Sequence, residues 1–136
     1  DNSVFTALET LYVDIFEDAD LHFFKKRFNE KSDIVTVVAL KESEIVGFKI
    51  GYHYNNSTFY SWVGGVKLTF RNQGIALRLS QLQEEKVRQK GYTKLRTKSM
   101  NRFKPMMILN LKNGFDITQI YTNDFGQTKI VFEKNL

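Results

Sequence analysis

The residues best suited to do chemistry lie in one short segment, where a predicted strand ends and a predicted helix begins. It reads Val66-Lys67-Leu68-Thr69-Phe70-Arg71-Asn72-Gln73-Gly74-Ile75-Ala76. Backbone N–H groups at the start of a helix have no partner within it and lie at the positive end of its macrodipole. Gly74 lets an anion approach the backbone without a Cβ in the way, and Arg71 adds a fork of donors. The segment predicts a phosphate site, although a purely structural turn of this composition is common and the spacing is neither Rossmann nor Walker.

Three positions in this segment fit a known signature. Arg71, Gly74 and Ala76 match every defined place of the pattern Arg/Gln-x-x-Gly-x-Gly/Ala, which resembles the signature of the GNAT superfamily of acetyl-CoA-dependent N-acetyltransferases. A helix that runs into Gly114-Phe115 is a second mark of that family, and the resemblance covers about residues 34–133. It implies a single GNAT-like acetyltransferase domain over residues 1–136, with helices flanking a mixed, mostly antiparallel sheet.

The resemblance also implies a cofactor and its contacts. The cofactor is acetyl-CoA as cosubstrate, with its pyrophosphate on the amides of the turn and its pantetheine arm paired like an extra strand with the main chain of Val66 and Leu68. A bulge at Gly64-Gly65 would aim N–H groups at the thioester oxygen. Asn101 is a candidate to bond the arm, the alternative being a helix cap. The expected cofactor-binding residues are Gly65, Val66, Leu68, Arg71, Asn72, Gln73, Gly74, Ile75, Ala76 and Asn101.

The resemblance implies direct transfer of the acetyl group to an amine whose identity stays open. Asn110 stands where many relatives carry a tyrosine that protonates the leaving thiolate, and an amide can only donate a hydrogen bond there. The predicted strand over residues 58–66 contains no carboxylate to act as a base. His53, Tyr60, Ser61 and a water relay remain as candidates.

The elements that must position this segment follow from the periodicity of the apolar residues. Helices are predicted over residues 5–16, 20–28, 74–90 and 105–113, and strands over 34–40, 45–54, 58–66, 94–98, 115–121 and 128–133. The predicted inward faces of the last two helices comprise Ile75, Ala76, Leu79, Leu82 and Val87, and then Met106, Met107, Leu109 and Leu111. This order indicates an α/β or α+β fold with a mixed sheet. The family's first strand is not visible before Phe5.

Composition limits the remaining alternatives. The 136 residues contain no cysteine, which excludes disulfides, a zinc-thiolate site and a cysteine nucleophile, and no metal site is predicted. A signal peptide and a membrane span are not recognisable, so we expect a cytoplasmic protein, whose oligomeric state, a homodimer included, stays open. The net charge of +5 favours anionic partners. A CoA-binding module without turnover and a nucleic-acid binder therefore remain as rivals, although no nucleic-acid motif is present.

Overall fold

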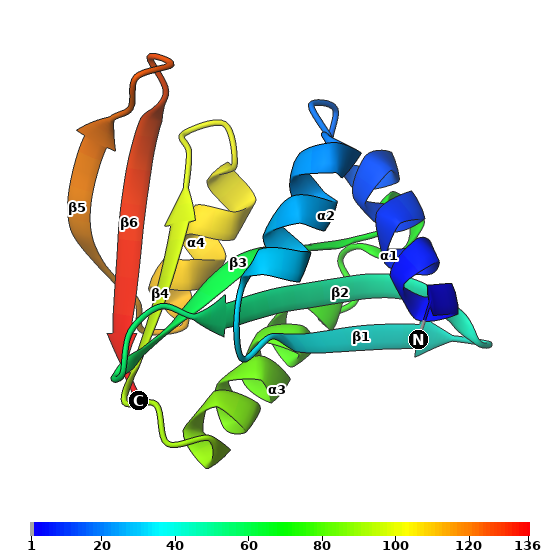
Figure 1. Ribbon diagram of the computed structural model, residues 1–136, viewed down its shortest axis with the longest axis horizontal. Coiled ribbons are helices and arrows are strands. Elements are labelled where there is room, and N and C mark those ends of the chain that lie inside the picture. Colours follow the sequence, from blue (N-terminus) through cyan, green and yellow to red (C-terminus); the bar gives the residue numbers. More distant parts are fainter. Residues whose placement is uncertain (1) are drawn as a thin grey trace.

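A computed structural model of the chain describes residues 2–136. These residues form the predicted succession of two helices, three strands, a helix, a strand, a helix and two strands, with one 3-10 turn (Figure 1). The elements are α1 Asn2–Ile15, α2 Leu21–Glu30, β1 Val35–Lys41, β2 Glu44–His53, β3 Thr58–Val66, η1 Leu68–Phe70, α3 Ile75–Gln89, β4 Lys94–Ser99, α4 Lys104–Lys112, β5 Asp116–Thr122 and β6 Thr128–Asn135. None of the helices described here is long and apolar enough to cross a bilayer.

The strands form one six-stranded sheet in the order β1-β2-β3-β4-β6-β5. Among the strands that the structure describes, only β3 and β4 run parallel, and the other neighbouring pairs are antiparallel. The predicted mixed, mostly antiparallel sheet flanked by helices is therefore confirmed. In the described residues β1 is an edge strand of this sheet, with no further strand beside it.

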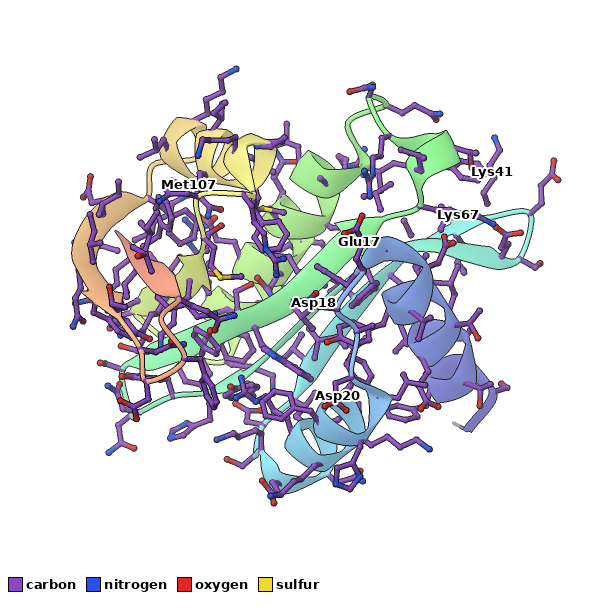
Figure 2. All side chains as sticks on the ribbon, turned by 90° about the horizontal axis from the view of Figure 1, so that it is seen from above. Glu17, Asp18, Asp20, Lys41, Lys67 and Met107 are labelled. Atoms are coloured by element: carbon purple, nitrogen blue, oxygen red, sulfur yellow. The ribbon has the colours of Figure 1, made fainter. Side chains whose placement is uncertain are left out.

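Helices cover both faces of the sheet (Figure 2). On one face α1 and α2 bury Leu8, Leu11 and Phe24 against Phe48 and Ile50 of β2. On the other face α3 buries side chains against all three of the first strands, and Met107 of α4 packs on the cluster that contains Phe59 and Phe132. Each Å² of apolar surface removed from water stabilises the fold by about 25 cal/mol, so the packing of these two helical layers on the sheet is the main source of stability.

Two predicted core positions are wrong, and a polar neighbour takes each place. Leu82 of α3 is 38% exposed and Leu111 of α4 is 50% exposed, whereas the adjacent Gln83 and Asn110 are buried. In α3 the reason is helical phase: Leu79, Gln83 and Val87 follow one another at intervals of four, so the three share one buried face. Periodicity of apolar residues alone selects Leu82, whereas Gln83 lies in line with Leu79 and Val87 on the buried face.

The central feature of the sheet is a split between its two parallel strands. β3 and β4 pair from Thr58 opposite Lys94 to Ser61 opposite Thr97. β3 then continues to Val66, and no strand among residues 2–136 pairs with it on that edge. The register against β2 shifts at the same point, which leaves Trp62 as the extra residue of a bulge. Bulges increase local twist, so this bulge bends β3 away from β4.

The bulge expected at Gly64-Gly65 is thus in the wrong place. Gly64 and Gly65 pair regularly with Lys49 and Phe48 of β2. They serve the close approach of neighbouring atoms, because a Cβ on Gly64 would stand 2.8 Å from the Phe48 carbonyl oxygen and one on Gly65 would stand 2.9 Å from Ile15 Cδ1. Trp62 takes the bulge, with its ring packed 5.2 Å from that of Phe24.

A glycine pair on β2 tests how tightly the α3 face is packed. A Cβ on Gly51 would stand 2.6 Å from the backbone oxygen of Tyr60, which cannot move aside, so we expect Gly51→Ala to destabilise the fold by about 2 kcal/mol or more. A Cβ on Gly47 would meet the side-chain ends of Leu79 and Ile75 at 3.2 and 3.3 Å and the Gly65 carbonyl oxygen at 3.4 Å. Because the side-chain ends can move aside and the oxygen is at ordinary contact distance, Gly47→Ala should change stability by less than about 1 kcal/mol. Urea unfolding midpoints measure both, and equal shifts would contradict the packing described.

Candidate functional site

The turn that leads into α3 presents backbone donors that have no partner within the helix. Gly74 is the N-cap residue, with φ of 78°, and it supplies no side-chain cap. The first helical hydrogen bond runs from Arg78 N to Gly74 O at 3.1 Å, so the N–H groups of Ile75 to Leu77 precede it and have no partner in the helix. A Cβ on Gly74 would meet nothing within 4 Å. The space beside Gly74 is therefore open, and the helix macrodipole favours an anion at this end of α3.

The backbone before Gly74 also turns sharply. Asn72 has φ of 64°, in the left-handed region that asparagine tolerates better than most residues. Successive turns of this kind bring main-chain N–H groups into a concave nest, a known anion-binding arrangement. Asn72, Gln73 and Gly74 are all exposed, so a ligand can reach them from solvent.

Arg71 joins this turn to the end of β3. Its Nε donates a hydrogen bond of 2.9 Å to the carbonyl oxygen of Val66. Within residues 2–136 no hydrogen bond is recorded for its two terminal nitrogens, and the side chain is exposed. Arg71 therefore fixes the last carbonyl of β3 and still presents donors that suit a phosphate oxygen.

The split leaves one edge of β3 available to a ligand. Lys67 N donates to Val46 O at 2.8 Å, so Val66, opposite Gly47, occupies a non-hydrogen-bonded position of the antiparallel ladder. Its N–H and C=O point away from β2, as the bond from Arg71 to its carbonyl confirms. Gly64 lies two residues earlier and points the same way. This row of main-chain groups can pair with an extended, amide-containing ligand.

Two of the predicted contacts need correction. Gly65 alternates with Gly64 and Val66, so its main-chain groups face Phe48 of β2 and the edge donor shifts to Gly64. Leu68 is not in a strand: it begins the turn η1, closed by Phe70 N to Lys67 O at 2.9 Å, and is 71% exposed. The ladder ends at Lys67, and Leu68 therefore cannot continue the pairing edge.

Asn101 precedes α4, and Asn110 lies in its last turn. Asn101 is exposed in the loop after β4, where its carbonyl accepts a hydrogen bond from Lys104 Nζ. It is not the helix cap, because Phe103 holds the N-cap position without a side-chain bond. Asn110 is buried, its carbonyl accepts from Phe115 N at 3.0 Å, and its amide makes no recorded hydrogen bond in the part of the chain described. An unengaged buried amide has donors to offer a ligand.

Of the three candidate bases, the structure engages His53 elsewhere. His53 Nδ1 lies 3.0 Å from the hydroxyl of Tyr92, which donates to Asp33 at 2.6 Å. His53 stands opposite Phe59, near the start of β3, and a strand rises about 3.3 Å per residue, so it lies on the order of 20 Å from the turn at its far end. His53 thus belongs to a network that ties β2 to the end of α3.

Tyr60 and Ser61 lie nearer to the split. Burial raises the pKa of the Tyr60 phenol far above its usual range, so near neutral pH it is a hydrogen-bond donor and a poor base. The Ser61 hydroxyl is buried without a partner among residues 2–136, at the last paired position of β3. Tyr60 and Ser61 are thus both neutral polar groups near neutral pH.

Sequence reasoning missed two polar side chains on the α3 face of the sheet. Gln83 is fully buried, and neither end of its amide has a hydrogen-bond partner in the described chain. Lys49 lies opposite Gly64, and burial lowers the pKa of its amine to about 8. A lysine between Phe48 and Ile50, inside an apolar strand, and a glutamine in phase with Leu79 were the signals in the sequence.

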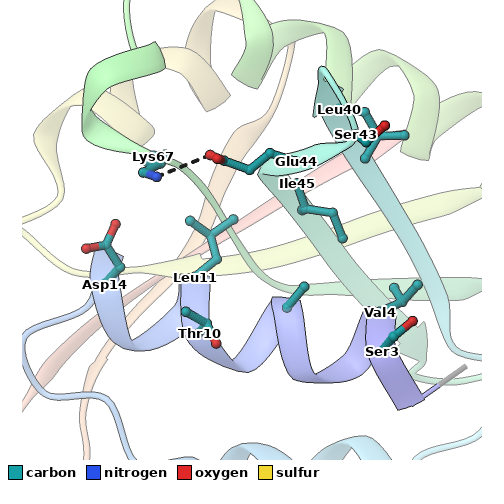
Figure 3. Close-up of a pocket in the computed structure, with 11 residues that line it drawn as sticks. Ser3, Val4, Thr10, Leu11, Asp14, Leu40, Ser43, Glu44, Ile45 and Lys67 are labelled. Atoms are coloured by element: carbon teal, nitrogen blue, oxygen red, sulfur yellow. Dashed lines mark hydrogen bonds and ion pairs between the residues drawn. The ribbon is translucent and has the colours of Figure 1, made fainter.

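A separate hollow of about 640 Å³ lies between α1 and the hairpin of β1 and β2 (Figure 3). Its lining includes Thr10, Asp14 and Glu44, and the ion pair of Glu44 with Lys67 at 3.2 Å crosses one side of it. None of the predicted site residues lines this hollow. Its size does not make it the candidate site, because the free backbone donors lie elsewhere.

Comparison with known families decides the family of the chain. A model described as the acetyltransferase (GNAT) family matches residues 2–106, which include the Arg71 to Ala76 signature. The chain belongs to the GNAT family. Comparison with curated protein sequences gives no match.

Solved structures of GNAT acetyltransferases share the fold. One is a GNAT family acetyltransferase from Elizabethkingia anophelis with acetyl-CoA bound: TM-score 0.78, 23% identity, covering 88% of this chain and 85% of that one. Another is the ribosomal-protein alanine N-acetyltransferase from Escherichia coli: TM-score 0.83, 13% identity, 99% and 89% covered. A third is NAA60 of Arabidopsis thaliana in complex with a bisubstrate analogue: TM-score 0.74, 20% identity, 94% and 90% covered. These likenesses confirm the predicted GNAT fold.

The contribution of the His53 network to stability can be tested at acid pH. Hydrogen bonds from Lys90 at 2.5 Å and from Tyr92 at 2.6 Å lower the pKa of the Asp33 carboxyl. Because the folded-state pKa lies below the unfolded value, these bonds stabilise the fold above about pH 4, and the gain is lost as pH falls through the folded pKa. Asp33→Asn, which tolerates the φ of 53° equally, should lower the melting temperature at pH 7 and converge with the parent near pH 2 to 3.

The control is Asp124→Asn, in the turn between β5 and β6, where the side chain makes no recorded hydrogen bond within residues 2–136. It should leave the melting temperature unchanged at pH 7. A constant difference between Asp33→Asn and the parent at every pH would contradict the role given to the carboxylate.

Proposed function

We propose that this chain transfers an acetyl group from acetyl-CoA to a primary amine. The observation that carries the proposal is the uncapped start of α3, where Gly74 leaves the first N–H groups of the helix free directly after the open edge of β3. Family membership and the acetyl-CoA bound to the Elizabethkingia relative support acetyl-CoA as the ligand. The chain acts in this proposal as one acetyltransferase domain.

In this proposal the cofactor spans two adjacent surfaces. The pyrophosphate binds the amides from Asn72 to Ala76, with Arg71 supplying a charged donor. The pantetheine arm pairs with the edge groups of Gly64 and Val66, in the manner of an added strand. Since Arg71 already holds the Val66 carbonyl, the arm pairs there through the N–H alone.

The chemical step is direct attack of a neutral amine on the thioester carbonyl. The nitrogen bonds to the acyl carbon, the carbon–sulfur bond breaks and the thiolate leaves. A main-chain N–H at the open edge stabilises the developing oxyanion, and positioning supplies much of the rate. Asn110 donates a hydrogen bond to the sulfur from its unengaged amide. A thiol of pKa about 8.5 leaves tolerably near neutral pH, so the absence of a phenol at residue 110 lowers the rate and keeps the reaction class.

A second candidate is a module that binds acyl-CoA without turnover. It is favoured by the lack of any carboxylate on β3 and by the amide of Asn110 in place of a proton donor. Both candidates require the same cofactor surface, so binding does not separate them. Release of free thiol from acetyl-CoA in the presence of a panel of small amines, polyamines, amino acids and peptide amino termini does.

The cofactor surface can be tested with two glycines that share one backbone conformation. Gly74 and Gly126 have φ of 78° and 77°, and a Cβ on either meets nothing within 4 Å. Leucine should cost each site a similar backbone strain of roughly 1 kcal/mol or more. Acetyl-CoA at millimolar concentration should raise the melting temperature of the parent and of Gly126→Leu, while Gly74→Leu should abolish the rise. An unchanged melt of the parent would count against acetyl-CoA binding.

Asn110 tests the donor to sulfur. If its amide binds the thiolate, Asn110→Ala should lower turnover by one hydrogen bond, about 0.5 to 1.5 kcal/mol or roughly 2- to 13-fold, with little change in acetyl-CoA affinity. Asn113→Ala, on the neighbouring C-cap residue, is the matched control and should leave turnover unchanged. Thiol release with an accepted amine over pH 6 to 9 measures both. Rates equal to the parent throughout would remove Asn110 from the site.

A further inference from the structure

We infer that Lys49 is an acyl acceptor within the chain itself, and that acetyl-CoA bound along β3 acetylates its side-chain amine. The inference rests on the proposed function for the acyl donor and adds an acceptor that needs no second substrate. It is carried by the position of the Lys49 side chain across Gly64, at the edge where β3 and β4 separate.

The stem of the Lys49 side chain lies over Gly64 of β3. Lys49 lies on β2 directly opposite Gly64. A Cβ on Gly64 would stand 3.1 Å from Lys49 Cγ and 3.2 Å from Lys49 Cα, so the lysine stem lies against the face that glycine leaves bare. A strand spacing of about 4.8 Å separates β2 from β3, and a lysine side chain spans more than that. Its amine therefore reaches toward the open edge, where the main-chain groups of Gly64 are free.

The surroundings of Lys49 favour a neutral amine. A Cβ on Gly47 would meet Leu79, and one on Gly51 would approach Phe59, so Lys49, which alternates with both, faces the layer that contains α3. The polar groups recorded without partners on this face are uncharged, namely the Gln83 amide and the Ser61 hydroxyl. No carboxylate forms an ion pair with Lys49 in the described chain.

Burial without a counterion makes the amine more reactive. It lowers the pKa of Lys49 to about 8. About a quarter of the side chain is then neutral at pH 7.5, compared with about 0.1% for a solvent-exposed lysine of pKa about 10.4. Only the neutral amine is nucleophilic, so the reactive fraction of Lys49 at pH 7.5 is about two hundred times that of a solvent-exposed lysine.

The step balances without another reactant. The neutral Lys49 nitrogen attacks the thioester carbon, the carbon–sulfur bond breaks, and the proton lost by nitrogen passes through water to the thiolate. The products are an amide and free CoA thiol. The amide carries no charge, so modification removes the cost of burying an ammonium group beside apolar residues.

The experiment uses the full chain and acetyl-CoA alone, followed by peptide mapping by mass spectrometry over time at pH 7.5. Lys49 should gain one acetyl group at least about a hundredfold faster than Lys41, an exposed lysine on β1, with a first-order rate that does not change with protein concentration. The heat-denatured chain should lose this preference. Lys49→Arg, which keeps the charge, should lose the fast modification, and Lys41→Arg should retain it.

The outcomes separate this inference from the proposed function. A melting-temperature rise with acetyl-CoA, together with modification of Lys49 no faster than of Lys41, overturns the inference and leaves the proposed function standing. No rise and no modification overturns both. A rate at Lys49 that increases with protein concentration shows transfer between chains and also overturns it. Mapping the parent chain decides each case even where a variant fails to fold.

Discussion

The separation of β3 from β4 after Ser61 is the constraint on which the rest of the molecule depends. Up to that residue the strands pair, and the Thr97 hydroxyl donates to the Ser61 carbonyl at 2.9 Å. Beyond it β3 bends away at the Trp62 bulge and keeps a free edge inside a sheet whose other strands are paired. A free edge in the middle of a sheet leaves backbone groups without partners, which costs free energy unless water or a ligand satisfies them. This edge is short, and it ends where Arg71 Nε donates a hydrogen bond to the carbonyl oxygen of Val66.

The start of α3 also leaves backbone groups without a side-chain partner. Most helices satisfy their first N–H groups with a serine, threonine, aspartate or asparagine at the N-cap, worth about 1 kcal/mol, and α2 does so through Asp20. In α3 that place is taken by Gly74, which has no side chain to offer. The helix is long and well packed through Leu79 and Val87, so it tolerates the missing cap. The free edge of β3 and the uncapped start of α3 are separated by one short turn, and they suit different ligand groups: the edge suits amides and the helix start suits anions.

The sequence was sufficient to predict the order of the elements and the position of the turn. It was insufficient to predict where β3 bulges and which way its backbone groups point. Apolar periodicity located every helix and strand, and the Arg71 to Ala76 spacing located the uncapped helix start. It could not locate the bulge, because a pair of glycines is a stronger local signal than a tryptophan, whereas the bulge depends on Trp62 packing against Phe24 of a distant helix. It could not decide whether Gly64 or Gly65 faces the split, since that depends on a register fixed by β2.

Buried polar residues explain the remaining errors and point to where the fold is under functional constraint. An apolar pattern treats Gln83, Asn110 and Lys49 as surface residues, yet Gln83 and Asn110 are buried and Lys49 is partly buried. A buried amide without a partner costs about 1 to 3 kcal/mol, so a leucine at residue 83 would give a more stable helix face. Stability alone therefore does not account for this set of residues. In the proposed function, the Asn110 amide gains a hydrogen bond with bound acetyl-CoA, and this bond offsets the cost of burying the amide in the free protein.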